Sequence, residues 1–126
     1  MDGRLRQLFK KHLPDFDWQS IDLTSGRGVP DTNCCYQGTE FWIEHKATQG
    51  RRVIVRPEQV AWIERRIRHG GKVFIAVRRK DELYLLHGAS ARQLACGEWP
   101  ERTALGCWHG GPARWCWQEI KQILLT

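Results

Sequence analysis

Three residues of this sequence, Asp31, Glu44 and Lys46, have the side-chain types and the spacing to act together on a phosphate group. Two carboxylates supply oxygen ligands for Mg²⁺, which keeps several waters and usually finds its remaining ligands on a substrate phosphate. A lysine beside such an ion can hold the attacking water and stabilise charge that develops on phosphate oxygens. The three residues therefore predict metal-assisted phosphate chemistry, if the fold brings them to one place.

A β-hairpin is the element that would bring them together. Residues 29–37 and 40–47 have the composition of two short strands, and Gly38-Thr39 between them is predicted as a two-residue loop. Such a loop folds the second strand back beside the first, so the hairpin predicts close contact between residues far apart in the sequence.

The strand register follows from this loop. Counting outward from it places Asn33 opposite Glu44 and Asp31 opposite Lys46, and residues directly opposite share one face of the sheet. Glu44 and Lys46, two residues apart, share that face as well. The register therefore predicts that both acids and the lysine converge on one patch.

The alternate residues of the second strand, Phe41, Ile43 and His45, point to the opposite face. Phe41 and Ile43 are expected in the core. His45 is expected to be packed or partly exposed on that face rather than to bind a ligand.

The pattern resembles the PD-(D/E)xK motif of the restriction-endonuclease-like nuclease superfamily. The segments that carry the resemblance are Pro30-Asp31, Glu44-His45-Lys46 and Arg56-Pro57-Glu58-Gln59. The last of these opens a predicted helix and resembles the additional glutamine of the VRR-nuclease and Holliday-junction-resolvase-like branches. The segment Ser25–Val29 fits their glycine-rich approach to the motif, and the resemblance covers about residues 3–88.

This resemblance implies a metal-dependent endonuclease that leaves a 5′-phosphate and a 3′-hydroxyl. Asp31 and Glu44 would hold Mg²⁺, or Mn²⁺ as its substitute, and Lys46 would position the attacking water. Gln59 would orient that water. For Gln59, a purely structural role as a helix cap is the alternative.

The first predicted helix, residues 3–13, departs from the family pattern. Many members carry an acidic metal ligand in this helix, whereas here it contains no aspartate or glutamate, only Gln7 facing a comparable way. A second metal ion, or a third protein ligand, therefore lacks support in this sequence.

The remaining elements predict a mixed sheet flanked by helices, in the order αβββαββ of the superfamily core. A first strand is expected at 16–23, a second helix from Pro57 to Gly70, and further strands at 72–78 and 82–87. The apolar run 72–78 is typical of a strand covered on both faces. It should run parallel to the Glu44 strand because a helix separates the two.

All 126 residues are expected to form one nuclease domain, with its core at about 3–88 and a tryptophan-rich C-terminal extension at about 89–126. A short helix capped by Ser90 and a terminal helix at 119–125 are predicted in the extension. Its tryptophans could form core, a dimer surface or a base-stacking platform. Core packing is the first expectation and a homodimer the second; the residues are Trp99, Trp108, Trp115 and Trp117.

Charge favours a polyanionic partner such as DNA. The chain has 20 Lys and Arg against 14 Asp and Glu, a formal net charge of +6. Arg27, Arg51 and Arg52 lie near the predicted patch in sequence, and a guanidinium suits a phosphate diester, so these three are candidate DNA contacts.

Branched DNA such as a Holliday junction is the expected substrate, because the chain is compact and carries no separate sequence-reading module. Nicking or flap cleavage is an alternative within the enzyme class. The alternative outside that class is a catalytically inactive DNA-binding or assembly module on the same fold. Small free-standing nucleases of this kind occur in bacterial and phage replication, repair and recombination, which implies a cytoplasmic location in a bacterial or phage-infected cell.

Five cysteines form no CxxC pair, and no apolar run approaches the ~20 residues of a membrane span. A reducing compartment and no membrane partner are therefore expected. A zinc site from Cys96, Cys107, His109 and Cys116 is an alternative, but the spacing matches no common zinc knuckle, and ordinary buried thiols are favoured.

Overall fold

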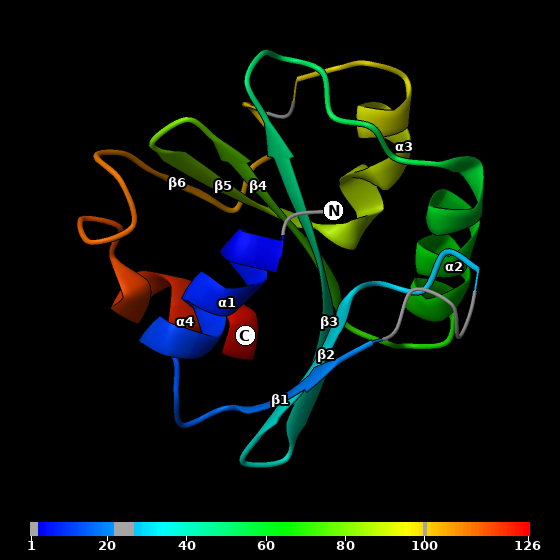
Figure 1. Cartoon of the computed structure of the whole chain (residues 1–126). Coiled ribbons are helices and arrows are strands. Elements are labelled where there is room, and N and C mark those ends of the chain that lie inside the picture. Colours follow the sequence, from blue (N-terminus) through cyan, green and yellow to red (C-terminus); the bar gives the residue numbers. More distant parts are fainter. Residues whose placement is uncertain (1–2, 22–26, 100) are drawn as a thin grey trace.

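The computed structural model describes residues 3–21, 27–99 and 101–126 of the chain. Ser25 and Gly26, part of the glycine-rich approach to Asp31, lie outside the described residues. The described chain forms a six-stranded sheet whose strands follow the order of the sequence, β1-β2-β3-β4-β5-β6. Helices cover both faces of this sheet (Figure 1).

The first seven elements have the predicted order αβββαββ. The strands are β1 (Asp17–Ser20), β2 (Thr32–Tyr36), β3 (Thr39–Thr48), β4 (Val73–Arg79), β5 (Glu82–His87) and β6 (Gly106–Trp108). The helices are α1 (Gly3–His12), α2 (Pro57–Arg68), α3 (Ala91–Ala95) and α4 (Trp117–Leu125), with a 3₁₀ turn η1 (Gly88–Ser90) before α3. Ser90 makes no capping hydrogen bond through its side chain, contrary to expectation. None of the described helices is long and apolar enough to cross a membrane.

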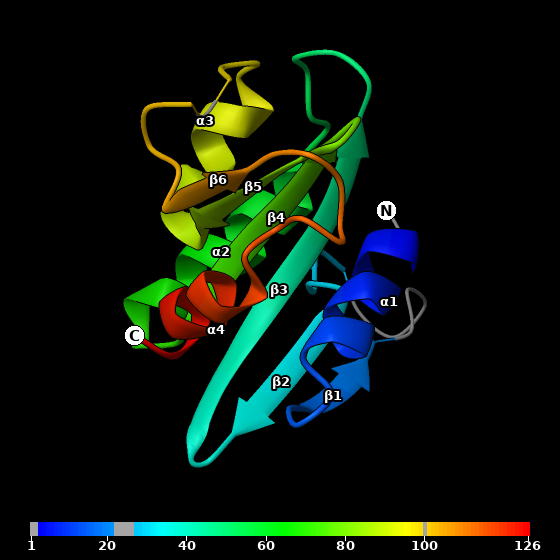
Figure 2. The same cartoon turned by 90° about the vertical axis from the view of Figure 1, so that its left-hand side faces the viewer.

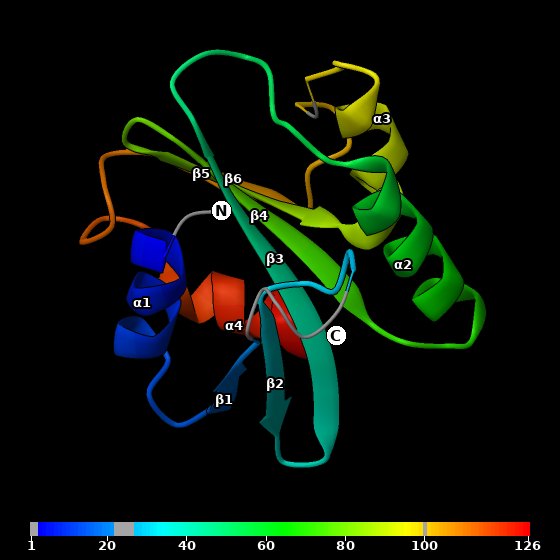
Figure 3. The same ribbon diagram turned by 45° about the vertical axis from the view of Figure 1, so that its right-hand side comes forward.

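The sheet separates two layers of helices. α1 and α4 lie against one face, and α2 and α3 lie against the other (Figures 1 and 3). β4 is buried between them: Phe74 and Ala76 pack with α1 and α4, while Val73, Ile75 and Val77 pack with α2 and α3. The prediction of a strand covered on both faces is confirmed.

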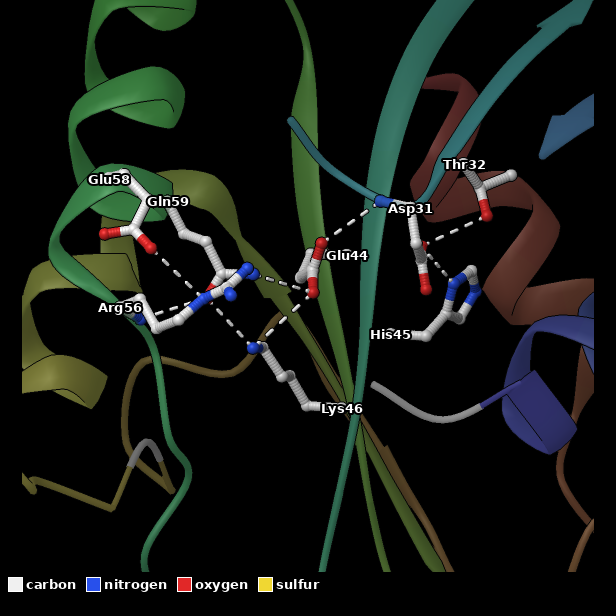
Figure 4. Close-up of polar contacts among 8 residues, drawn as sticks. All are labelled: Asp31, Thr32, Glu44, His45, Lys46, Arg56, Glu58 and Gln59. Atoms are coloured by element: carbon white, nitrogen blue, oxygen red, sulfur yellow. Dashed lines mark hydrogen bonds and ion pairs between the residues drawn. The ribbon is translucent and has the colours of Figure 1, made fainter. Parts of the chain in front are cut away.

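β3 and β4 run parallel, as predicted, and all other neighbouring strands pair antiparallel. Because parallel neighbours need a crossover connection, the chain leaves the end of β3 and returns through α2 before it enters β4. This crossover places the start of α2 over the face of β3 that carries Glu44 and Lys46, as Figure 4 shows.

The register of the β2–β3 hairpin (Figure 2) differs from the prediction by two residues. Tyr36 pairs with Thr39, and the loop is Gln37-Gly38, with φ of 48° and 86°. Two successive positive φ values are the signature of a type I′ turn, which a β-branched residue such as Thr39 would resist. Asn33 therefore pairs with Trp42 rather than with Glu44, and the predicted pairing of Asp31 with Lys46 is wrong.

The tryptophan-rich C-terminal segment packs onto the core, in line with the first expectation for it. Trp108 and Trp115 are buried in the cluster on the α1 and α4 face. Trp117 packs edge-on against Phe9 and stacks on His12, with ring centroids 5.2 and 4.5 Å apart. The guanidinium of Arg79 lies over the ring of the partly buried Trp99. These side chains extend the domain core beyond β5.

The cysteines divide into buried and exposed thiols. Cys34 is fully buried, whereas Cys96, Cys107 and Cys116 are exposed, which corrects the expectation that these three are buried. Cys107 Sγ lies 3.6 Å from His109 Nε2. Within the described residues no group of three or more His, Cys, Asp or Glu side chains is placed to hold a metal ion.

Cys34 should resist modification in the folded protein. Burial raises the pKa of its thiol to about 12, and a buried thiol is inert. Brief iodoacetamide treatment at about pH 8.5, near the ordinary thiol pKa, should label Cys96 and Cys116 but not Cys34, as read by peptide mass spectrometry. Labelling of Cys34 at the rate of Cys96 would contradict the buried placement.

Candidate active site

Glu44, Lys46 and Gln59 form a closed hydrogen-bonded group between β3 and α2 (Figure 4). Lys46 Nζ donates to Gln59 Oε1 at 3.0 Å and lies 3.5 Å from Glu44 Oε2. Gln59 Nε2 donates to the same Glu44 oxygen at 3.1 Å. Alternation along β3 directs Glu44 and Lys46 to the α2 face, so this group arises from the strand period and the crossover helix.

Gln59 both caps α2 and contacts the sheet. It lies in the first turn of the helix, where its Oε1 accepts the backbone N–H of Arg56 at 2.9 Å. The same oxygen accepts from Lys46. Because four backbone N–H groups at a helix start lack partners within the helix, a glutamine there can cap the helix and still reach the sheet. The cap fixes the amide that contacts the strand.

Gly28 lets the chain before Asp31 pass close to the start of α2. Its φ is 77°, and a Cβ at this position would lie 2.0 Å from the carbonyl oxygen of Glu58. Only glycine accepts both the left-handed backbone and this approach. The segment that leads into the motif therefore rests directly on the helix that carries Gln59.

Asp31 lies beside this group, but one oxygen of its carboxylate is held by residues outside the group. Its backbone N–H donates to Glu44 Oε1 at 3.1 Å. Asp31 Oδ1 instead lies 2.9 Å from His45 Nδ1 and accepts from Thr32 Oγ1 at 3.1 Å. The predicted proximity of Asp31 to Glu44 is present, but the Asp31 carboxylate makes no hydrogen bond to Lys46.

His45 is the residue whose contact the sequence did not reveal. It lies on the opposite face of the sheet from Glu44, as predicted, and is fully buried there on the side of α1. Its ring packs edge-on against Phe9, with ring centroids 4.8 Å apart. Strand alternation separates it from Glu44, but Asp31 precedes the first residue of β2 and is not bound by that alternation. The place of Asp31 directly after Pro30 was the available signal that it need not follow the strand alternation.

The ionised form of the Glu44 carboxyl is disfavoured in the folded protein. Burial, followed by the nearby Asp31 carboxylate, raises the pKa of Glu44 above its ordinary value, and Lys46 opposes that shift. Only 5% of Glu44 and 8% of Lys46 is exposed to solvent. A cation bound beside Glu44 would lower this pKa again, because it favours the ionised carboxylate.

The site opens into a cleft of about 520 Å³. Glu44, Lys46 and Gln59 line it together with Arg52 and Arg56. The other lining residues are Gly28, Val29, Ala47, Thr48 and Ile54. Two guanidinium groups at a cleft with a buried acid and lysine suit a phosphate diester.

The predicted DNA contacts occupy different positions. Arg52 lines the cleft, whereas Arg51 lies 3.7 Å from Glu101 and over the Trp99 ring. Arg27 is exposed. Arg56 also lines the cleft and was not predicted to do so, although its place directly before the proline that opens α2 was the signal for it.

The donor chemistry suits a hard divalent cation. Asp31 Oδ2 is buried without a hydrogen-bond partner, and burial and Asp31 raise the pKa of the neighbouring Glu44 carboxyl. Oxygen ligands of this kind are those that Mg²⁺ and Mn²⁺ prefer. Asp31 and Glu44 are therefore the side chains that fit such an ion.

Comparison with known proteins identifies the fold. No protein-family model and no curated protein sequence matches the chain significantly. Among solved structures, the chain is similar to Hjc, a Holliday junction resolvase of Archaeoglobus fulgidus, with a TM-score of 0.53 and 14% identity. The similarity covers 68% of this chain and 74% of that chain. The fold is restriction-endonuclease-like. The predicted fold class is therefore confirmed.

Gln59→Ala should destabilise the protein. The substitution removes a helix cap and leaves buried Lys46 and Glu44 each short of a partner, so the free energy of unfolding should fall by about 2–4 kcal/mol. Urea denaturation followed by circular dichroism measures this change. Gln93→Ala, on the exposed side of α3, is the matched control and should stay within about 0.5 kcal/mol of wild type. Equal stability of the two variants would contradict the bridging role.

Proposed function

We propose that the protein is a metal-dependent DNA endonuclease of the PD-(D/E)xK type, acting on branched DNA. The observation that carries this proposal is the hydrogen-bonded group of Glu44, Lys46 and Gln59 at an arginine-lined cleft. The restriction-endonuclease-like fold supports it, and so does the similarity to a protein named as a Holliday junction resolvase.

The chain's own residues divide the work of phosphodiester hydrolysis. Asp31 and Glu44 would hold Mg²⁺ or Mn²⁺, which when bound polarises the phosphate and makes water a better nucleophile. The Lys46 amino group would hold the attacking water, and Gln59 would fix that amino group through the hydrogen bond to its Oε1. Arg52 and Arg56 would bind the flanking phosphates. Water adds to phosphorus and the bond to the 3′-oxygen breaks, which leaves a 5′-phosphate and a 3′-hydroxyl.

A second candidate is an inactive DNA-binding module on the same fold. It is favoured by α1, which has no acidic residue and exposes Gln7 where an additional ligand is expected. Such a module would keep the arginine-lined cleft and lose cleavage.

A symmetric branched substrate also suits a homodimer, which multi-angle light scattering would detect.

The first test is cleavage of a labelled four-way junction and of a linear duplex with the same arm sequence. Each is incubated with Mg²⁺, with Mn²⁺ and with a chelator. Metal-dependent cuts paired across the junction support the proposal, and equal cutting of the duplex would replace it with a general endonuclease. Tight binding without cleavage of either substrate would establish the inactive module instead.

Glu44→Gln and Lys46→Met should each reduce cleavage by about 100-fold or more, because several kcal/mol of transition-state stabilisation disappear. DNA affinity measured with a chelator should change little. Glu40→Gln and Lys11→Met, at exposed positions of β3 and α1, are the charge-matched controls and should cleave like wild type. Full activity in both site variants would refute the assignment.

Arg52→Ala and Arg56→Ala should weaken DNA binding and its dependence on salt. For every phosphate that an arginine no longer neutralises, the slope of log affinity against log salt should fall by about 0.9 for duplex DNA. Fluorescence anisotropy over a salt series measures the slope. Arg51→Ala should change it less, since Arg51 lies against Glu101 and Trp99. Arg68→Ala, near the far end of α2, is the control; an unchanged slope in the cleft variants would place DNA elsewhere.

A further inference from the structure

Two of the buried polar atoms without partners belong to one pair of residues. Among the described side chains, the buried nitrogen and oxygen atoms that make no hydrogen bond are Asp31 Oδ2, His45 Nε2 and Trp99 Nε1. Leaving such an atom without a partner costs stability in the folded protein. The free oxygen of Asp31 lies on the residue whose backbone contacts Glu44, so the cost falls at the site itself.

The other oxygen of Asp31 is held by two groups. His45 Nδ1 lies 2.9 Å from Oδ1, and Thr32 Oγ1 donates to the same atom at 3.1 Å. A carboxylate oxygen accepts, so the imidazole donates from Nδ1. With Oδ1 engaged twice, rotation of the carboxyl group is restricted and Oδ2 keeps one direction.

The imidazole is itself fixed by packing. His45 is completely buried, and Phe9 of α1 contacts its ring edge-on at 4.8 Å. Thr32, also completely buried, is the first residue of β2. The two donors therefore come from the two strands of one hairpin, and helix α1 supports the imidazole from behind.

We propose that His45 is a positioning residue for the metal site, which together with Thr32 fixes Asp31 Oδ1 so that Oδ2 stays free as a ligand. The inference rests on the proposed function, in which Asp31 and Glu44 bind the divalent cation. Hydrogen bonds from neighbouring groups orient a ligating carboxylate and reduce the freedom that it loses on binding. The histidine within the motif thus serves the acid that precedes the hairpin.

Mn²⁺ affinity, measured by electron paramagnetic resonance of the free ion, tests this role without cleavage. Asp31→Ala should weaken binding. His45→Leu should weaken it by about 10- to 100-fold, the usual effect of removing an orienting partner. His45→Asn, whose amide nitrogen replaces Nδ1, should restore most of the affinity. Thr32→Val keeps the shape of the side chain and should weaken binding in part.

A double variant separates positioning from general packing. If His45 acts through Asp31, His45→Leu should weaken Mn²⁺ binding no further in the Asp31→Ala background. Wild-type affinity in His45→Leu, or an equal reduction in both backgrounds, overturns the proposal. If His45→Leu does not fold, His45→Gln replaces it, because its amide lies one bond too far out to mimic Nδ1.

The same measurements separate this inference from the proposed function. If Asp31→Ala binds Mn²⁺ like wild type, the metal site itself is wrong and the positioning role falls with it. If Asp31→Ala weakens binding while the His45 and Thr32 variants do not, only the positioning role fails. Thermal melting of every variant confirms that the folded protein is being compared.

Discussion

One glutamine joins the two parts of the site. Through a single side chain, Gln59 caps α2, holds Lys46 and donates to Glu44. The parallel pairing of β3 and β4 makes this contact available, because it requires a crossover whose helix begins over β3. The geometry of the candidate catalytic group is thus tied to the topology of the sheet. A chain with an antiparallel β3–β4 hairpin would have no helix start at this place.

The site is built at the expense of stability. Burial and the adjacent Asp31 raise the pKa of Glu44, so its ionised form is disfavoured in the folded protein relative to the unfolded chain. That penalty applies above the folded-state pKa and fades as the pH falls through it. A divalent cation beside the two acids would remove the same penalty at neutral pH. Unfavourable groups of this kind are expected at sites that bind a ligand, where residues are not optimised for the stability of the fold alone.

Periodicity in the sequence was sufficient to predict strands β1 to β5, helices α1 and α2 and the face of β3 on which each residue lies, but not the short strand β6. The hairpin register was off by two residues because Gly38 was paired with Thr39 rather than with Gln37 in the turn. Side-chain alternation repeats every two residues, so the error left Glu44 and Lys46 on the correct face. The direction of the Asp31 carboxylate could not be predicted, since it depends on His45 and Phe9, which approach it only in three dimensions.

The tip of the β2–β3 hairpin is a position at which the chain could accept inserted residues. Roughly 17 Å of strand, at about 3.4 Å per residue, separates Thr39 from Glu44, and Gly38 at the turn is exposed. Pairing of β3 with β4 independently anchors the strand from Trp42 onward. Insertions at the tip would therefore lengthen the ribbon without rotating any side chain of the site. An epitope or a fluorophore could be carried there, and natural variation in length could accumulate there, with the geometry of the candidate site left intact.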